Sequence, residues 1–305
     1  MKPVMYHYVR PCAPGLPHLP YLSLGNFKSQ LDHFAQEYGF VSRRAFIDWV
    51  EGGAAPEGVL LTFDDGLRDH VDFVLPALRR RDLFAIFYVS SAPVLTQSLL
   101  DVHKVHLALG RIGGAAAFYW LKENAPQLIP PDVDSGPTHY AAQNSDRATK
   151  FVKDLFNWRL SAEDRGPLLD ALLNHAFVGS PPLWNEFYLD AKELRALSDA
   201  GMGVGPHGHR HLVPSRLSAE EERADIETSC VFIEDTGSSL IWGFCYPYGA
   251  FTERTQAAVA KVGCPFALAV RAGEIEKPLR ESARYALPRH NCNAFPHGTA
   301  SFGGA

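Results

Sequence analysis

The chain lacks any long hydrophobic run. Nowhere in the sequence do about 18 apolar residues follow one another, so we expect no membrane-spanning helix. The N-terminal sequence MKPVMYHYVRP has no apolar stretch long enough for a secretory signal peptide. These two absences lead us to predict a cytoplasmic protein.

Cysteine is scarce, and its spacing forms no motif. The five cysteines are an odd number, and no two of them are arranged as CxxC. A chain of 305 residues can bury a large core without a disulfide framework. We therefore expect small buried thiols rather than crosslinks. The positions are Cys12, Cys230, Cys245, Cys264 and Cys292.

Positive charge is neither abundant nor clustered. The formal net charge is -5, and the densest basic cluster, Arg79, Arg80 and Arg81, is followed at once by Asp82. Proteins that bind nucleic acid usually present a larger basic surface, so we expect no nucleic-acid partner. We interpret the triplet as the solvated end of a helix. The oligomeric state is left open by the composition.

What the sequence does contain is an alternation of short apolar runs and helical patterns. Apolar runs between turn residues are typical of buried parallel strands. Capping signals such as Ser218 with Glu221, and the stops Gly201 and Gly263, support the helices. The alternation favours an α/β fold with a parallel sheet, either a barrel or doubly wound. The predicted strands are 4–9, 59–63, 84–89, 202–204, 240–246, 266–270 and 285–287, and the predicted helices are 26–38, 69–81, 190–200, 218–234 and 252–262.

One stretch, about 96–187, contains no convincing strand. It has helical patterns over 99–121, 146–160 and 162–176, a loop-like composition over 129–138, and Gly113-Gly114 interrupting the first helix. We predict a helical insertion within a single domain that spans 1–305. The small, polar residues 298–305 are predicted to be a flexible tail.

Two adjacent carboxylates, Asp64 and Asp65, stand where a predicted strand meets Gly66. Neighbouring side chains on a strand point to opposite faces. A turn at the carboxyl end of the strand can nevertheless aim both into one cleft, where α/β barrels carry their catalytic groups. Taken alone, an Asp-Gly pair is more often an ordinary turn or a helix cap.

Three histidines follow the strand predicted at 202–204. His207 and His211 are four residues apart, and on one helical turn they would share a face and bind one metal ion. His209 lies two residues from each, and we assign it to the surroundings of the site or to solvent. Alone, this spacing is weak evidence for a metal site.

Two imidazoles and one carboxylate are a recurrent ligand set for a catalytic metal ion. Such an ion leaves a position for water and lowers the pKa of that water toward about 7. If one of the two aspartates binds the ion, the other can accept the proton as general base. The adjacent pair thus predicts a division of labour without saying which aspartate has which role.

Two further clusters stand at predicted strand ends. The segment 246–249, Tyr-Pro-Tyr-Gly, turns the chain sharply and would expose a backbone N–H able to stabilise an oxyanion. An aromatic strand end is an equally good interpretation of it. His290 ends the segment Leu287-Pro288-Arg289-His290 and is a candidate general acid for a leaving amine, or else a structural histidine.

In this order, the four clusters resemble the polysaccharide deacetylase family, carbohydrate esterase family 4, with the NodB homology fold. Thr62-Phe63-Asp64-Asp65-Gly66 matches its first motif, 207–211 its second, and Tyr246-Pro247-Tyr248-Gly249 a common form of its third. The opening Met5-Tyr6-His7-Tyr8-Val9 is similar to the first strand of many members. The resemblance covers residues 2–95 and 188–292, and it implies an irregular barrel of the (β/α)7 type.

The resemblance also implies roles for individual residues. Asp64 would be the general base, whereas Asp65, His207 and His211 would bind a divalent metal ion, most often zinc. The Tyr248 backbone N–H would hold the oxyanion together with the metal.

The fourth cluster is the least well matched to the family. His290 would take the place of the general acid. Many members carry an arginine where this chain has Cys245, and Arg289 is the candidate that would supply this charge. Tyr246, Pro247 and Arg289 are also expected to contact the substrate, as is His103 in the inserted helices, although an amphipathic helix explains His103 more simply.

The predicted reaction is hydrolysis of an N-acyl group, expected to be acetyl, from an amino sugar, with metal-bound water attacking the amide carbonyl. The missing secretion signal favours a small or carrier-linked sugar in surface-glycan biosynthesis. Alternatives are a deacetylase of chitin, peptidoglycan or poly-N-acetylglucosamine, and a hydrolase of a non-sugar amide. A carbohydrate-binding module with a decayed site is the non-enzymatic alternative, and the retention of both aspartates and both histidines argues against it.

Overall fold

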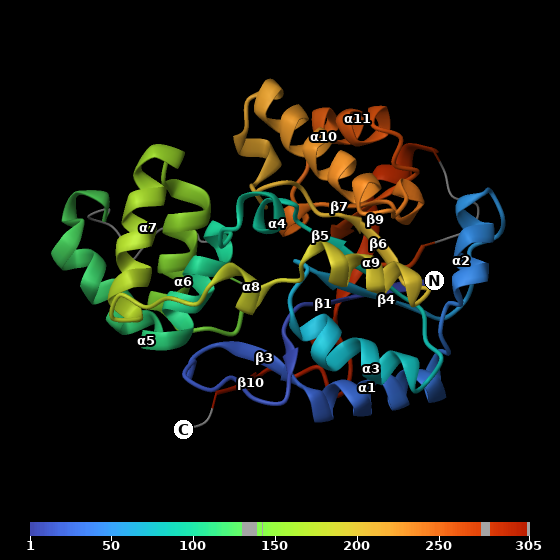
Figure 1. Cartoon of the computed structure of the whole chain (residues 1–305), viewed down its shortest axis with the longest axis horizontal. Coiled ribbons are helices and arrows are strands. Elements are labelled where there is room, and N and C mark those ends of the chain that lie inside the picture. Colours follow the sequence, from blue (N-terminus) through green and yellow to red (C-terminus); the bar gives the residue numbers. More distant parts are fainter. Residues whose placement is uncertain (130–138, 142, 276–280, 304–305) are drawn as a thin grey trace. The chain divides into compact units, whose positions relative to one another are not determined.

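Seven short apolar segments form one parallel sheet in the computed structural model (Figure 1), which describes residues 1–129, 139–141, 143–275 and 281–303. The strands lie in the order β6-β5-β4-β1-β9-β8-β7, and every pairing is parallel. All seven predicted strands are found, with shifted ends. They are β1 (Lys2–Tyr6), β4 (Val59–Asp64), β5 (Ala85–Val89), β6 (Gly203–Pro206), β7 (Phe244–Cys245), β8 (Ala267–Val270) and β9 (Leu287–Asn291).

The two edge strands, β6 and β7, approach each other and nearly close the sheet into a barrel. The Tyr88 hydroxyl, on β5, donates a hydrogen bond of 2.8 Å to the carbonyl of Trp242, just before β7. A Cβ atom on Gly205 of β6 would lie 3.0 Å from the carbonyl oxygen of Gly243, so only glycine fits there. The predicted (β/α)7-type barrel is therefore confirmed.

Alternation along the strands divides the core into an outer and an inner layer. All six residues of β4 are buried, as expected for a parallel strand covered on both faces. Leu61 and Phe63 pack with the outer helices, whereas Leu60 belongs to the inner cluster. Asp64 is four residues from Leu60 and therefore lies on the same face of the strand, so its carboxylate points into the barrel.

A helix that the sequence analysis did not predict, α2 (Arg43–Val50), supplies large apolar side chains to the inner cluster. Phe46 and Trp49 are buried and contact the ring of Phe266, with centroids 5.8 and 5.4 Å away. Phe266 directly precedes β8, so this helix packs at the end of the barrel opposite the strand carboxyl ends. The end of the barrel at which the strands have their carboxyl termini is therefore left for polar residues.

The predicted outer helices are present, and their termini follow the predicted signals. Ser218 and Glu221 form a reciprocal capping box, and Gly201 and Gly263 follow their helices with φ of +83° and +88°. The helix predicted at 69–81 is divided into a π-helical turn, η1, and a short α-helix. The helices around the barrel are α1 (Leu24–Glu37), η1 (His70–Val74), α3 (Leu75–Arg79), α4 (Ala92–Thr96), α8 (Trp184–Phe187), α9 (Ala191–Asp199), α10 (Ala219–Asp235) and α11 (Glu253–Lys261). Two short helices among them, α4 and α8, were not predicted.

Two predicted strands differ in extent from the observed ones. Residues Leu240–Trp242 form a 3-10 turn, and Gly243, with φ of +73°, separates it from β7. At the seventh strand, Glu281–Ala286 is a 3-10 segment and β9 extends to Asn291. The strand therefore continues beyond Arg289 instead of ending before it.

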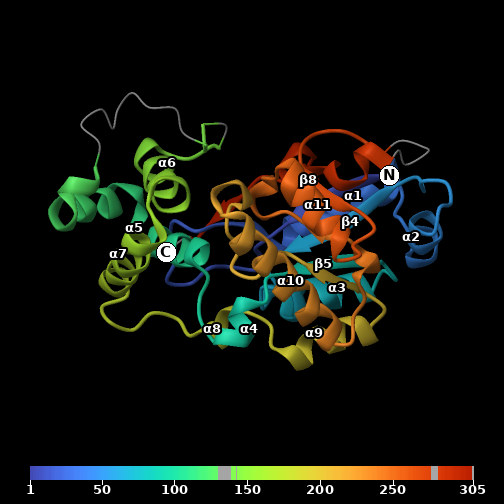
Figure 2. The same cartoon turned by 90° about the horizontal axis from the view of Figure 1, so that it is seen from above.

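The chain divides into two compact units, and 12–21, 99–183 and 301–305 form the second. Its helices α5 (Asp101–Asn124), α6 (Arg147–Asp154) and α7 (Ala162–Ala176) pack together (Figures 1 and 2). Gly113 breaks α5 as predicted, with φ of +78°. A Cβ on Gly114 would lie 2.2 Å from Thr149 Oγ1, which shows how closely α5 and α6 approach.

The remaining short strands are β2 (Val9–Arg10), β3 (Pro20–Ser23) and β10 (Ser301–Phe302). Strand β10 lies within the predicted tail and pairs with β3, whereas 304–305 and most of the loop predicted at 129–138 lie outside the described residues. The single-domain organisation stays a prediction. Among the described residues, no helix combines the length and hydropathy that crossing a membrane requires.

One buried histidine in η1, His70, gives the fold a dependence on pH. Its ring lies 5.5 Å from the rings of both Phe63 and Phe87. Burial lowers its pKa from 6.5 to about 4. The neutral ring donates a hydrogen bond of 3.2 Å from Nε2 to the carbonyl of His7.

We predict that His70→Gln weakens the dependence of stability on pH. The unfolded chain binds a proton at His70 below about pH 6.5, whereas the folded chain does so only near pH 4. The unfolding free energy of the wild type should therefore fall by about 2–3 kcal/mol more than that of the variant between pH 7 and pH 4.5. Urea titrations at both pH values measure this difference, with the exposed His297→Gln as control. Equal losses in the wild type and His70→Gln would contradict the assignment.

Candidate active site

The two adjacent carboxylates face the same space, as the turn after β4 allows. Asp64 ends the strand, and Asp65 takes the left-handed conformation with φ of +79°. Such a backbone costs on the order of 1–3 kcal/mol and is common at functional sites. Nε2 of His207 lies 3.9 Å from Asp64 Oδ2 and 3.6 Å from Asp65 Oδ1. Both acids therefore converge on one imidazole.

The histidine motif forms a loop and not the helical turn that its spacing indicated. Gly208 and His211 have φ of +72° and +52°, which no helix contains. Nδ1 of His207 donates a hydrogen bond of 2.7 Å to the carbonyl of Cys245. Nε2 of His211 lies 3.4 Å from Asp65 Oδ1. The two imidazoles meet because the loop reverses, since residues four apart lie on one face only in a helix.

Asp65, His207 and His211 form a group that fits a divalent metal ion. Their ligand atoms all lie within 4.8 Å of one another, and all three residues are buried. The bond from His207 Nδ1 to a carbonyl places the proton on that nitrogen and leaves Nε2 as a lone-pair donor. One carboxylate and two imidazoles are a donor set that suits zinc.

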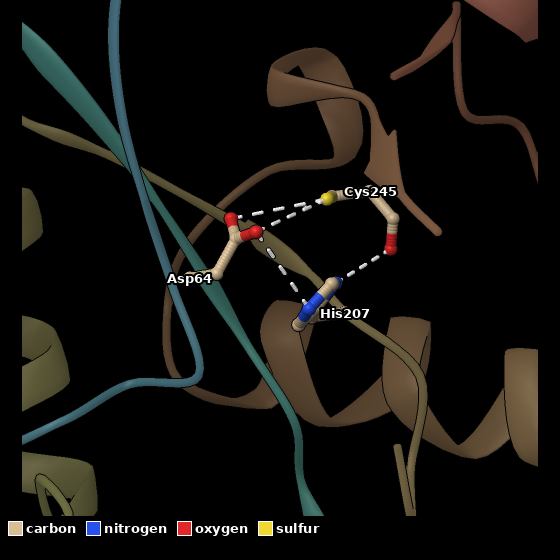
Figure 3. Close-up of side chains that lie close together, drawn as sticks. All are labelled: Asp64, His207 and Cys245. Atoms are coloured by element: carbon tan, nitrogen blue, oxygen red, sulfur yellow. Dashed lines mark hydrogen bonds and ion pairs between the residues drawn. The ribbon is translucent and has the colours of Figure 1, made fainter. Parts of the chain in front are cut away.

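A second group, Asp64, His207 and Cys245, is also compact but is a poorer metal site. Figure 3 shows the Asp64 carboxylate facing the Cys245 thiol, while the His207 ring reaches the Cys245 carbonyl. Burial raises the pKa of this thiol well above its usual range, so it stays protonated. A metal ion binds the thiolate form, which favours the group that contains Asp65.

Arg289 reaches into the barrel from β9 and holds Asp64. Its Nη1 and Nη2 donate hydrogen bonds of 2.6 and 2.7 Å to the two carboxylate oxygens. Burial alone would raise the pKa of Asp64, but Arg289, His207 and His7 together lower it. Asp64 is therefore an ionised carboxylate. Arg289 supplies the charge that Cys245 cannot; its side chain is 1% exposed, and its expected substrate contact stays a prediction.

In the segment 246–249, Tyr246 belongs to the hydrophobic core, whereas Tyr248 lies at the candidate site. Tyr246 is fully buried, stacks on Phe251 at 5.0 Å and donates its hydroxyl to the carbonyl of Tyr285, and its expected substrate contact stays a prediction. Alternation explains this burial, because Cys245 occupies the inward position. Tyr248 has φ of +58°, and its ring lies 4.8 Å from that of His211. Its place as oxyanion donor stays a prediction.

Three further residues predicted to contact the substrate or to take part in catalysis lie in different parts of the structure. Pro247 lies against the histidine loop, with its Cγ 3.2 Å from where a Cβ on Gly208 would be. His103 is fully buried within α5 of the second unit, and its expected substrate contact stays a prediction. His290 does not reach the carboxylates: it is paired with Val4 in the middle of β1, and its ring lies 5.5 Å from Phe295. Since Arg289 faces inward, its neighbour His290 faces outward.

His7, to which the sequence analysis assigned no role, lies at the position that His290 was expected to fill. It directly follows β1, and its Nε2 lies 3.8 Å from Asp64 Oδ2 and 4.0 Å from Asp65 Oδ2. Its side chain is 37% exposed, whereas both acids are buried. The signal that would have found it is its place just after a parallel strand, which it shares with Asp65 and His207.

Comparisons with known proteins agree with this arrangement. The model of the family described as polysaccharide deacetylase matches residues 168–267, which include the histidine loop and the segment 246–249. No curated protein matches the chain in a sequence comparison.

Solved structures with the same fold include three bacterial proteins. PplD, a deacetylase of Streptococcus pyogenes in complex with acetate, is 14% identical with a TM-score of 0.58, over 95% of this chain and 91% of that one. IcaB from Ammonifex degensii is 18% identical with a TM-score of 0.52, over 95% and 91%. The BpsB deacetylase domain from Bordetella bronchiseptica is 16% identical with a TM-score of 0.51, over 94% and 95%.

These solved structures establish the fold, and the family model covers the part of the chain that carries the histidines. The resemblance predicted from the motifs is confirmed. Over residues 168–267 the chain is similar to the polysaccharide deacetylases, and this similarity together with the shared fold supports a hydrolase of the N-deacetylase type.

Proposed function

We propose that this protein hydrolyses the N-acetyl group of an amino sugar with a divalent metal ion, zinc by its donor set, held by Asp65, His207 and His211. The observation that carries the proposal is a compact, buried ligand group with a second, ionised carboxylate beside it. A binding module would need no such carboxylate. The arrangement therefore favours catalysis over the decayed-site alternative.

Asp64 is the proposed general base. When bound, the metal ion would polarise the acetyl carbonyl and lower the pKa of a coordinated water. Arg289 holds the Asp64 carboxylate ionised and in one orientation through two hydrogen bonds. Asp64 can then accept a proton from the attacking water, which is the role the family resemblance implied for it.

His7 is the proposed general acid in place of His290. Attack of water on the carbonyl carbon and cleavage of the C–N bond release acetate and an amine, and the amine nitrogen must gain a proton. His7 is the partly exposed imidazole beside both carboxylates. His70 fixes its backbone by donating to the His7 carbonyl. The Tyr248 backbone N–H is proposed to stabilise the oxyanion.

The proposed substrate is a small or carrier-linked amino sugar in the cytoplasm, as the sequence prediction stated. The description of the matching family as polysaccharide deacetylases favours a polymer as the second candidate. The chemistry at the acetyl group is the same for both. The two differ only in what lies on either side of the sugar.

Acetate release tests this proposal. We expect zinc-loaded protein to release acetate from N-acetylated sugars in a panel of nucleotide-linked monomers, oligomers and polymers. Asp64→Asn should lower the rate by about 10²–10⁴-fold because it removes the general base. The variant should keep its zinc, measured by elemental analysis. Asp65→Ala should lose the zinc.

A result of no acetate release from any member of the panel would refute the deacetylase proposal. Near-normal turnover by Asp64→Asn would refute only the role of Asp64. Release from polymers alone would replace the small-sugar substrate with the second candidate.

His7→Gln should lower acetate release from amides by about 10²-fold, because the departing amine then lacks its proton donor. Zinc content should not change. Hydrolysis of an activated aryl acetate, whose leaving group needs no proton, should fall much less. His290→Gln is the matched control and should keep near-normal rates on both substrates. A larger loss for His290→Gln than for His7→Gln would reverse the assignment.

Arg289→Met should destabilise the protein by about 3–5 kcal/mol, because it leaves the buried Asp64 carboxylate without a counter-charge. Adding Asp64→Asn should restore a large part of that loss, since the remaining side chain is neutral. Urea unfolding of the single and double variants measures the coupling. Arg44→Met, which removes an exposed ion pair with Asp48, should cost little. Simple additivity of the two site substitutions would refute the coupling.

A further inference from the structure

The histidine loop, residues 207–211, has a shape that requires support. Two of its five residues are left-handed, Gly208 at φ of +72° and His211 at φ of +52°. For a non-glycine residue this conformation is costly and persists only where surrounding contacts impose it. The spacing of the two imidazole nitrogens depends on this reversal. The contacts that hold the loop therefore determine whether the imidazoles can share one ion.

One side of the loop is held by a carboxylate from α10. Asp225 Oδ2 accepts a hydrogen bond of 2.8 Å from the backbone N–H of His209, and its Oδ1 accepts one of 3.0 Å from that of Arg210. Successive backbone N–H groups in such a loop form a concave anion site, here filled by a side chain. Hydrogen bonds to an ionised carboxylate are stronger than neutral ones.

The fit between the loop and this carboxylate is close. A Cβ atom on Gly208 would lie 2.9 Å from Asp225 Oδ2, a separation at which the carboxylate or the loop must move. The absence of a side chain at Gly208 thus allows the contact as well as the left-handed backbone. Asp225 is itself buried. It cannot move aside into solvent without leaving two N–H groups unsatisfied.

The other side of the loop is held by the segment that follows β5. Ser90 Oγ donates to the carbonyl of His207 at 2.9 Å, and the backbone N–H of Ala92 donates to that of His209 at 2.9 Å. Ser90 and Ala92 thus bind the loop's carbonyl groups, whereas Asp225 binds its N–H groups. Both hydrogen-bonding sides of the loop are supported, and the Nε2 atoms of His207 and His211 lie 3.6 and 3.4 Å from Asp65 Oδ1.

We propose that Asp225 is a positioning residue for the metal-binding histidines: its two hydrogen bonds keep the loop in the conformation that brings Nε2 of His207 and His211 to one ion. This inference rests on the proposed function, because it presupposes the metal group. It adds a residue, 14 positions beyond the last histidine in sequence, that the motifs did not single out. Asp225 would touch neither the ion nor the substrate.

Glu222 offers a matched control on the same helix. It is also a buried carboxylate, and it lies nearly one turn before Asp225. Its partners are Arg254 and Thr255 of α11, and none of its hydrogen bonds reaches the histidine loop. Loss of either carboxylate should destabilise the fold, but only loss of Asp225 should alter the metal site.

The test is metal binding by the full chain. For Asp225→Asn we expect zinc affinity, measured by competition with a chelator, to fall by about 10–100-fold, as for other residues that orient ligands. The visible absorption of bound Co²⁺, which reports coordination geometry, should also change. Glu222→Gln should keep wild-type zinc affinity and Co²⁺ absorption even where its melting temperature falls. Gly208→Ala disturbs the same contact from the loop side and should weaken zinc binding in the same way, which keeps the test valid if Asp225→Asn does not fold.

Three results would overturn the inference, and they are distinguishable. Wild-type zinc affinity and an unchanged Co²⁺ spectrum in Asp225→Asn would refute the role of Asp225 while leaving the proposed function intact. Failure of the wild-type protein to bind either ion would refute the metal site and the inference with it. Equal losses of affinity in Asp225→Asn and Glu222→Gln would reduce Asp225 to a general structural role.

Discussion

The arrangement of the site depends on the buried ion pair between Asp64 and Arg289. Removing two charges from water costs several kcal/mol for each, which only close, hydrogen-bonded contact can offset. The pair meets this condition with two hydrogen bonds of 2.6 and 2.7 Å inside the barrel. Because both Asp64 oxygens are engaged by Arg289, the neighbouring Asp65 is the carboxylate left to join the histidines. The proposed division of labour between the adjacent acids thus follows from one guanidinium.

Strained backbone conformations are concentrated around the candidate metal group. Seven non-glycine residues among those described have positive φ, and three of them, Asp65, His211 and Tyr248, surround the candidate metal group. Strand alternation would send consecutive side chains to opposite faces. A left-handed residue just beyond a strand end reverses the chain and returns the side chain to the barrel mouth. The strain is therefore the means by which the three loops turn their functional groups inward.

The positions of His290 and His7 illustrate how sheet register decides which side chains reach the candidate site. Both residues lie on or next to paired strands, β9 and β1. His290 is level with Val4, in the middle of β1, whereas His7 lies beyond the end of that strand. Only the end of a parallel strand opens on the barrel mouth, where catalytic groups collect. A histidine within a strand instead faces either the packed interior or the outer helices.

Local signals predicted the seven strands, most of the helices and the candidate metal group, because each segment carries its own apolar run, capping residues or motif. It did not reveal α2, whose Phe46 and Trp49 are recognisable as core only once the barrel exists to receive them. Arg289 was already a candidate from the sequence for the charge missing at Cys245, whereas its two hydrogen bonds to Asp64 and the burial of Tyr246 depend on the tertiary structure. The tertiary structure also places His7, and not His290, beside the two aspartates, and it brings Asp225 against the histidine loop. These are contacts between residues far apart in the chain, and they depend on register and side-chain direction, which no local pattern encodes.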